Sequence, residues 1–144
     1  MRFLALLLIA GAIQAQAPAT KAPDDPNLKS IGTMSEVMID IIFPTSNEIF
    51  YVGRDEKKSL KDWEDLTNNA LMLAESANLL MAPNRAKDNG RWMEDAKLLR
   101  EVGVKAFALA KAKDLDGLKS LNDDLYEACQ SCHVHYRPGY KRRP

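Results

Sequence analysis

Two cysteines and a histidine near the end of the chain have the types and the spacing that could carry chemistry. Cys129, Cys132 and His133 form a C-x-x-C-H sequence, which uses both cysteines of the 144-residue chain. On a helix, residues three and four positions apart share one face, so the two thiols and the imidazole would point the same way. This is the attachment signature of c-type haem, in which the histidine binds the iron. The motif predicts one covalently bound haem c per chain.

Three other uses of such a motif compete with haem attachment. A disulfide between cysteines three positions apart in a helix is poorly compatible with the geometry of the bridge. A thioredoxin-like redox pair normally follows a strand at the start of a helix, whereas these cysteines lie late in a helical pattern. A zinc site would need a fourth ligand, and His135, the other histidine, cannot converge with the first three from one helix.

The second axial ligand of a haem iron has to come from upstream, because only eleven residues follow His133. His135 points about 160° away from His133 around a helix, so it cannot reach the opposite side of the same iron. A methionine thioether is the remaining good ligand. Past the first residues the chain offers five of them: Met34, Met38, Met72, Met81 and Met93.

The segments that hold these residues are predicted to be helices. From Leu28 onward apolar residues return every three or four positions, and no stretch shows the alternation of a strand. The four amphipathic segments run from Leu28 to about Val52, from Leu60 to Pro83, from about Gly90 to Lys113, and from Asp114 to Pro138. Their short connections predict an all-α, antiparallel up-down-up-down four-helix bundle with the haem attached to the last helix.

Some details of these segments bear directly on the site. Ser59 and Asp114 are candidate N-caps. Pro44 removes a backbone donor and clashes with the preceding turn, so a kink or break is expected there. Ahead of it, one stripe contains Ile31, Met34, Met38 and Ile41. The inward face of the third segment is small, which would leave room for a group that is not a side chain.

The first residues have the build of a secretory signal peptide. Arg2 precedes an apolar stretch from Phe3 to Ile13, and small and polar residues follow. The stretch is shorter than the roughly 20 residues that cross a bilayer, so we expect cleavage after Ala15 and no membrane insertion afterwards. Residues 1–15 are thus a predicted signal peptide, 16–27 a flexible leader and 28–144 one cytochrome domain in the periplasm. With 20 basic and 20 acidic residues, a nucleic-acid partner is not expected.

On these residues the sequence resembles the cytochrome c′ family, the class II c-type cytochromes, which are four-helix bundles. The specific part is Cys129-Gln130-Ser131-Cys132-His133 followed by Tyr136 and Arg137, and a weaker similarity extends from about Leu28 to Tyr140. Met38, within Glu36-Val37-Met38-Ile39, matches the place where six-coordinate, low-spin members carry their axial methionine. The resemblance implies that Met38, with Met34 as the alternative, is the distal iron ligand and that Arg137 lies near the haem.

The resemblance also implies a function. An iron held on both sides leaves no position for a substrate, so we expect an electron carrier serving redox partner proteins, and not an enzyme. The alternative is a five-coordinate haem that binds or senses a small gas such as nitric oxide, as in high-spin members of the family. Members often pair through their first two helices, so a homodimer is implied by analogy.

Overall fold

The computed structural model describes residues 20–54 and 58–140. Within these ranges all the regular structure is helical, compatible with a four-helix bundle, and none of the helices is long and apolar enough to span a membrane. The predicted signal peptide, residues 1–15, lies outside the described residues, as do residues 16–19 of the predicted leader. The all-α prediction is confirmed for the described part of the chain.

The first helical stretch consists of α1 (Met34–Glu36), the π-helix η1 (Val37–Ile42) and α2 (Phe43–Phe50), followed by a short 3-10 helix, η2 (Val52–Arg54). It begins later than the predicted Leu28 because Thr33 caps it. The Thr33 hydroxyl accepts from the Glu36 N–H (3.2 Å), and the Glu36 carboxylate accepts from the Thr33 N–H (2.7 Å). Ile31, which the sequence pattern placed on the helical stripe, precedes this cap and is exposed.

The expected disruption at Pro44 takes the form of a widened turn, and the helix continues through it. In a regular α-helix the proline ring clashes with the carbonyl four residues earlier and leaves it without a donor. Here η1 lies immediately upstream, and the Phe43 N–H bonds to the Met38 carbonyl, five residues back. The buried Thr45 hydroxyl adds a donor for the Ile41 carbonyl (2.7 Å). The wide turn therefore absorbs the proline without ending the helix.

The next two helices, α3 (Leu60–Met81) and α4 (Arg91–Ala112), agree with the prediction. Ser59 caps α3 as predicted, accepting from the Asp62 N–H. The two helices approach closely, since a Cβ added to Gly103 would lie 2.7 Å from the backbone of Ala74. At this position the small face of α4 brings two helices together and leaves no extra room, contrary to our expectation.

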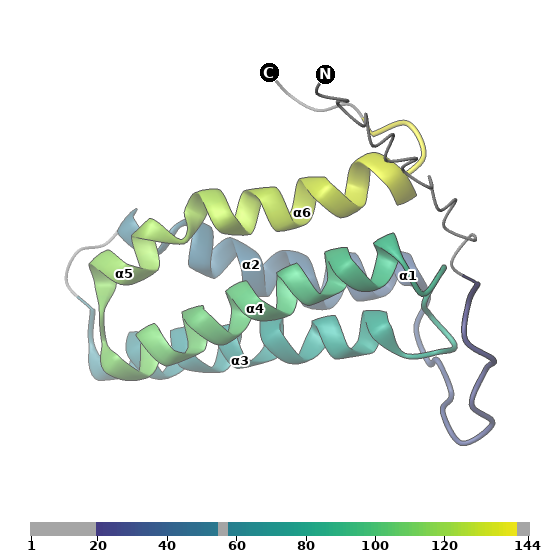
Figure 1. The fold of residues 1–144 in the computed structure, drawn as a ribbon. Helices are drawn as coiled ribbons and strands as arrows, with labels where there is room; N and C mark the ends of the chain where they lie inside the picture. Colours follow the sequence, from purple (N-terminus) through teal and green to yellow (C-terminus); the bar gives the residue numbers. More distant parts are fainter. Residues whose placement is uncertain (1–19, 55–57, 141–144) are drawn as a thin grey trace, which may run out of the picture.

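The predicted fourth helix is divided into α5 (Leu115–Ser120) and α6 (Asn122–Tyr136). Asp114 caps α5 as predicted, accepting from the Gly117 N–H at 2.8 Å. At the division the Leu121 N–H bonds to the Leu118 carbonyl three residues back, which tightens the turn. Both leucines remain buried, as does Leu125 on α6. The helix that carries the C-x-x-C-H motif is therefore a separate, straight segment (Figure 1).

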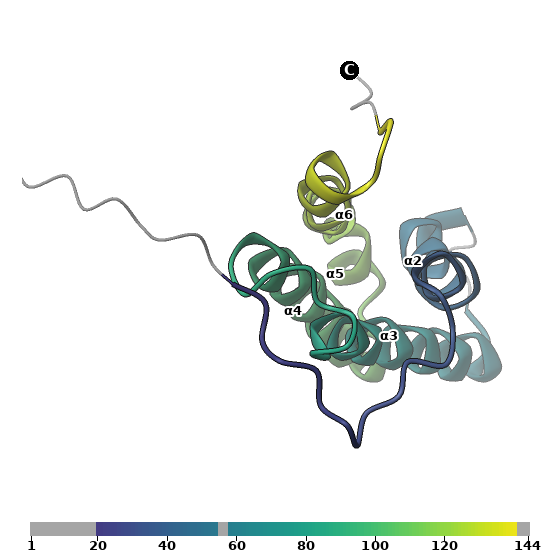
Figure 2. The same cartoon turned by 90° about the vertical axis from the view of Figure 1, so that its right-hand side faces the viewer.

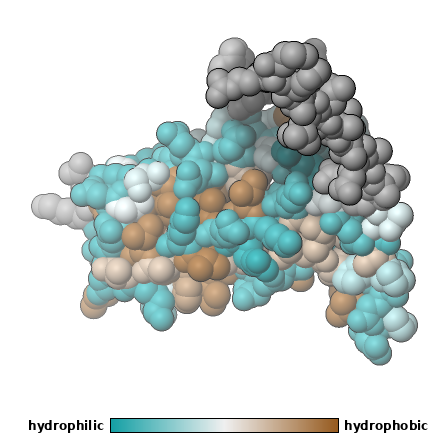
Figure 3. Space-filling view, viewed as in Figure 1, coloured by the Kyte–Doolittle hydropathy of each residue, from teal (hydrophilic) through white to brown (hydrophobic). Residues whose placement is uncertain are grey.

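The helices enclose one apolar core. In the end-on view α6 lies above α4 and α3 lies beside α4, while α2 lies across the bundle from α4 (Figure 2). α6 packs mainly on α4 and more lightly on α2. The largest fully buried apolar side chains come from α2, α3, α5 and α6: Ile49, Leu73, Leu118 and Leu125. The surface in the orientation of Figure 1 is hydrophilic with apolar patches between the polar side chains (Figure 3).

The segment before α1 is tied to the connection between α3 and α4. Asn84 accepts a hydrogen bond from the Asp25 N–H (3.2 Å) and donates one to the Leu28 carbonyl (2.6 Å). Arg85 donates to the Gly32 carbonyl at 2.9 Å. These bonds fix the point from which the chain turns into the first helical stretch.

Candidate functional site

The motif residues and Met38 line the same cavity. Cys129, Cys132 and His133 come from α6, Met38 comes from η1, and the cavity has a volume of about 40 Å³. The remaining lining is apolar except for one carboxylate: Ile42, Leu80, Asp95, Ala96, Leu99 and Ala128. Residues from opposite ends of the described chain thus meet at one place.

The other predicted residues lie outside this lining. Met34 packs against the core from the side of α1. Arg137 is exposed at the end of α6, with its guanidinium 5.8 Å from the centre of the Tyr140 ring. His135 is exposed too, and its Nδ1–H donates to the Ser131 carbonyl on the same helix (2.8 Å). Of the methionines considered, Met38 is the one that meets His133 at the cavity.

Burial makes both cysteine thiols weaker acids than an exposed cysteine. It raises the pKa of Cys129 to about 11, and burial together with the nearby Asp95 carboxylate raises the pKa of Cys132 to about 12. Thiol–disulfide exchange instead depends on a lowered thiol pKa, often at a helix N-terminus. Both thiols are free and lie in the second half of α6. The site therefore has the opposite electrostatics to a thioredoxin-like redox pair.

The surroundings of His133 favour the neutral form of its imidazole. Burial lowers its pKa, and the positive charge of Arg137 lowers it further. A neutral imidazole is the form that binds a metal. The centre of the Tyr140 ring lies 5.4 Å from that of the imidazole, so an aromatic side chain flanks this histidine.

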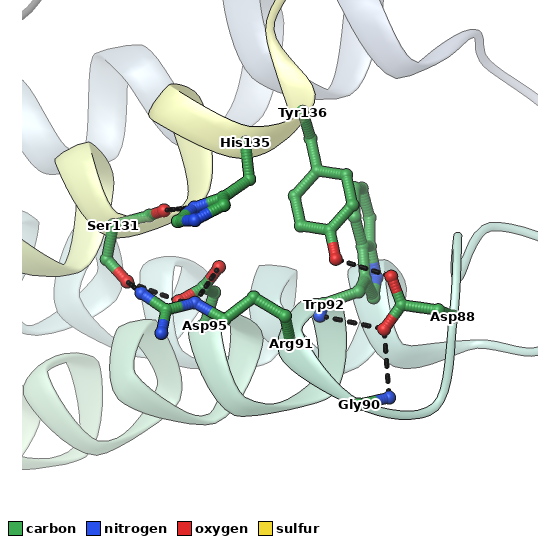
Figure 4. Close-up of polar contacts among 8 residues, drawn as sticks. All are labelled: Asp88, Gly90, Arg91, Trp92, Asp95, Ser131, His135 and Tyr136. Atoms are coloured by element: carbon green, nitrogen blue, oxygen red, sulfur yellow. Dashed lines mark hydrogen bonds and ion pairs between the residues drawn. The ribbon is translucent and has the colours of Figure 1, made fainter. Parts of the chain in front are cut away.

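A buried polar cluster joins the motif to α4 (Figure 4). Ser131, between the two cysteines, donates its hydroxyl proton to the Asp95 carboxylate and accepts from the Arg91 guanidinium at 3.0 Å. The Arg91 Nε lies 3.1 Å from the same carboxylate. Both oxygens of the Asp95 carboxylate have a partner, which offsets the cost of burying it.

A second cluster fixes the end of α6 to the start of α4 (Figure 4). Tyr136 donates to the Asp88 carboxylate, which also accepts from the N–H groups of Gly90 (2.8 Å) and Trp92 (3.1 Å). The Tyr136 hydrogen bond is the main cause that lowers the pKa of Asp88, while burial and Asp88 raise the pKa of Tyr136 to about 12. The Tyr136 ring also packs edge-on against Trp92, with centroids 5.0 Å apart.

The Asp95 cluster was not predicted from the sequence. One signal was available, since Asp95 falls on the same helical stripe as Trp92, Ala96 and Leu99, where a carboxylate would have to be buried. Its partner Ser131 could not be recognised, because the middle positions of a C-x-x-C-H motif carry no pattern of their own.

The donor set at the cavity fits a haem. Two thiols can form the thioethers of a c-type attachment, and an imidazole and a thioether are established axial ligands. The largely apolar lining suits the faces of a porphyrin. A cavity of about 40 Å³ has room for only a few water molecules, so a bound porphyrin requires its walls to separate. The wall opposite α6 comes from η1, whereas α6 packs mainly on α4.

Zinc has no comparable arrangement, since within residues 20–54 and 58–140 no three His, Cys, Asp or Glu side chains form a group able to hold a metal ion. Comparison with known proteins adds nothing to this picture, because no protein-family model, curated protein or solved structure matches the chain. The function has to be inferred from the site itself.

Proposed function

We propose that this protein is an exported, periplasmic electron-transfer cytochrome of the c type and not an enzyme. In this proposal the bundle alternates in direction, and its last helix carries one haem c. The observation that supports it is the common lining of one apolar cavity by Met38, Cys129, Cys132 and His133. Two attachment groups and two axial ligands of complementary chemistry are more than a single motif on one helix would provide.

Each residue has a defined part in this proposal. The thiols of Cys129 and Cys132 would hold the haem as thioethers, each S–H adding across one vinyl group so that sulfur bonds one carbon and hydrogen the other. His133 supplies a neutral imidazole nitrogen, and Met38 supplies a thioether sulfur. When bound, the haem supplies a one-electron Fe(III)/Fe(II) couple, and histidine–methionine ligation in a dry site raises its reduction potential. The apolar wall keeps water from the iron.

The clusters at Asp95 and Asp88 hold α6 in place for this task. They connect the middle of the motif, at Ser131, and the end of α6, at Tyr136, to the α4 side of the bundle, where packing is dense. Electron transfer is fastest when the ligands change little between oxidation states, and a rigid α4–α6 contact keeps the His133 side of the site fixed.

The visible spectrum of the reduced protein, with and without carbon monoxide, tests the proposal. We expect sharp low-spin bands that carbon monoxide does not change, because Met38 occupies the sixth position. Met38→Leu should become high-spin and bind the gas, whereas Met34→Leu, the matched control one turn away, should keep the wild-type spectrum. A wild-type spectrum that is high-spin and shifted by carbon monoxide would favour the gas-binding alternative. A response of Met34→Leu alone would make Met34 the ligand.

A further inference from the structure

One carboxylate stands out in the wall of the cavity. Asp95 is 1% exposed and lines the cavity together with Cys132. A carboxylate in such a place is costly unless it is paired. Asp95 occupies a position where an apolar side chain would match the rest of the cavity lining.

The charges of the Asp95 cluster are unequally placed. The Asp95 side chain is 1% exposed, whereas that of its partner Arg91 is 49% exposed. Water and salt screen the half-exposed guanidinium much more than the buried carboxylate. The cavity wall is therefore more negative than the formal neutrality of the ion pair suggests.

Asp95 and Cys132 line the same cavity, so the turn of α6 that bears the motif faces the buried carboxylate. Ser131 holds the carboxylate in this position, because its hydroxyl donates to Asp95 and its oxygen accepts from Arg91. The buried end of the ion pair is thus the negative one.

We propose that Asp95, fixed by Arg91 and Ser131, places a buried carboxylate beside the haem and thereby lowers the reduction potential of the iron. This inference rests on the proposed function. The oxidised iron carries one positive charge more than the reduced iron, so a buried anion stabilises the oxidised form. Asp95 is a tuning and positioning residue, since it neither bonds the haem nor binds the iron.

The experiment is a mediated redox titration of the haem-bearing protein, followed by its visible bands. We expect Asp95→Asn to raise the midpoint potential, with the oxidised-to-reduced ratio at a fixed potential falling about tenfold, or about 59 mV for one electron. Asp124→Asn is the matched control: Asp124 pairs with Lys105 (3.4 Å) between the same two helices, and its side chain is 55% exposed. That control should leave the potential nearly unchanged.

A second variant separates charge from loosening of the fold. Arg91→Gln removes the cation of the same cluster, so it should lower the potential or leave it unchanged, whereas a loosened α4–α6 contact would move both variants in the same direction. The inference is overturned if Asp95→Asn shifts the potential no more than Asp124→Asn does, or if Arg91→Gln raises it equally. A wild-type chain without covalent haem would overturn the proposed function as well, so the two failures are distinguishable.

Discussion

The two thiols of α6 are protected by their surroundings in the haem-free chain. Their raised pKa values, about 11 for Cys129 and about 12 for Cys132, follow mainly from burial. At pH 8 a thiol of pKa 11 has about a hundredfold less thiolate than one of pKa 9. We expect iodoacetamide to alkylate the folded haem-free chain at least about 100-fold more slowly than the same chain in urea, as followed by mass spectrometry. Equal rates would contradict the burial of the thiols.

The same shifts make stability depend on pH in a defined direction. The folded-state pKa of each thiol lies above its unfolded value near 9, so the protonated thiols stabilise the fold fully below pH 9. That contribution is lost as the pH rises toward 11 and 12. Attachment to haem removes both titrating groups, so the alkaline loss should belong to the haem-free chain alone.

Among individual residues, the sequence predicted best those whose chemistry requires a fixed spacing along the chain. Cys129, Cys132 and His133 could be selected because their separation puts them on one helical face, and the structure has all three in one cavity lining. Asp95 could not be recognised, because burial of a carboxylate depends on partners from another helix. Met38 was selected by resemblance, since its spacing alone did not separate it from Met34.

At the scale of the helices, the stability of the first helical stretch depends on the hydroxyl of Thr45, the residue after Pro44. The buried Thr45 hydroxyl donates to the carbonyls of Ile41 (2.7 Å) and Ile42 (3.1 Å), where the wide turn interrupts the regular ladder. Thr45→Val keeps the shape and removes this donor, so it should cost about 1 to 3 kcal/mol in denaturant unfolding.

Thr67→Val is the matched control for this prediction. The Thr67 hydroxyl also donates to a carbonyl one turn back, that of Trp63 (2.7 Å), but within the regular ladder of α3. Its loss should change the free energy of unfolding by less than about 0.5 kcal/mol. Equal effects at the two threonines would show that the π-turn needs no special support.

The contact between α3 and α4 depends on a residue without a side chain. A Cβ at position 103 would lie 2.7 Å from the Cα and N atoms of Ala74. In a free helix Gly→Ala is favourable by about 1 kcal/mol, but here the clash should make Gly103→Ala destabilising by about 1 to 3 kcal/mol. The exposed neighbour Val104→Ala should change the stability by less than about 0.5 kcal/mol. A stabilised Gly103→Ala would refute the close packing.

Helix starts followed the sequence where a cap was recognised: Ser59 and Asp114 were identified as N-caps and act as such. The cap at Thr33 was not recognised. A disruption at Pro44 was expected, but its form, a π-turn that accommodates the proline, was not. The division at Leu121 could not be predicted, because the tight turn there depends on keeping Leu118 and Leu121 buried in the core. The small residues on the inward face of α4 were recognised from the sequence. They were expected to leave room for a cofactor, whereas Gly103 packs against α3.

The molecule as a whole is a helical bundle in which α6 is packed densely against α4 and lightly against α2. α6 is joined to α4 by two polar clusters, whereas it meets α2 across few contacts. The all-helical class followed from apolar periodicity alone. The size of the cavity did not, because it depends on how closely α6 and the first helical stretch approach, which no local pattern encodes.

The central claim is covalent haem on α6, and the mass of the denatured protein tests it most directly. The full chain should be produced in cells in which cytochrome maturation operates, denatured and treated with iodoacetamide, and its mass should be measured by mass spectrometry. We predict the mature chain plus one haem, with no alkylated cysteine, and loss of the double attachment in Cys132→Ala. A colourless chain that lacks the mass of a haem, with both Cys129 and Cys132 alkylated, would contradict the account.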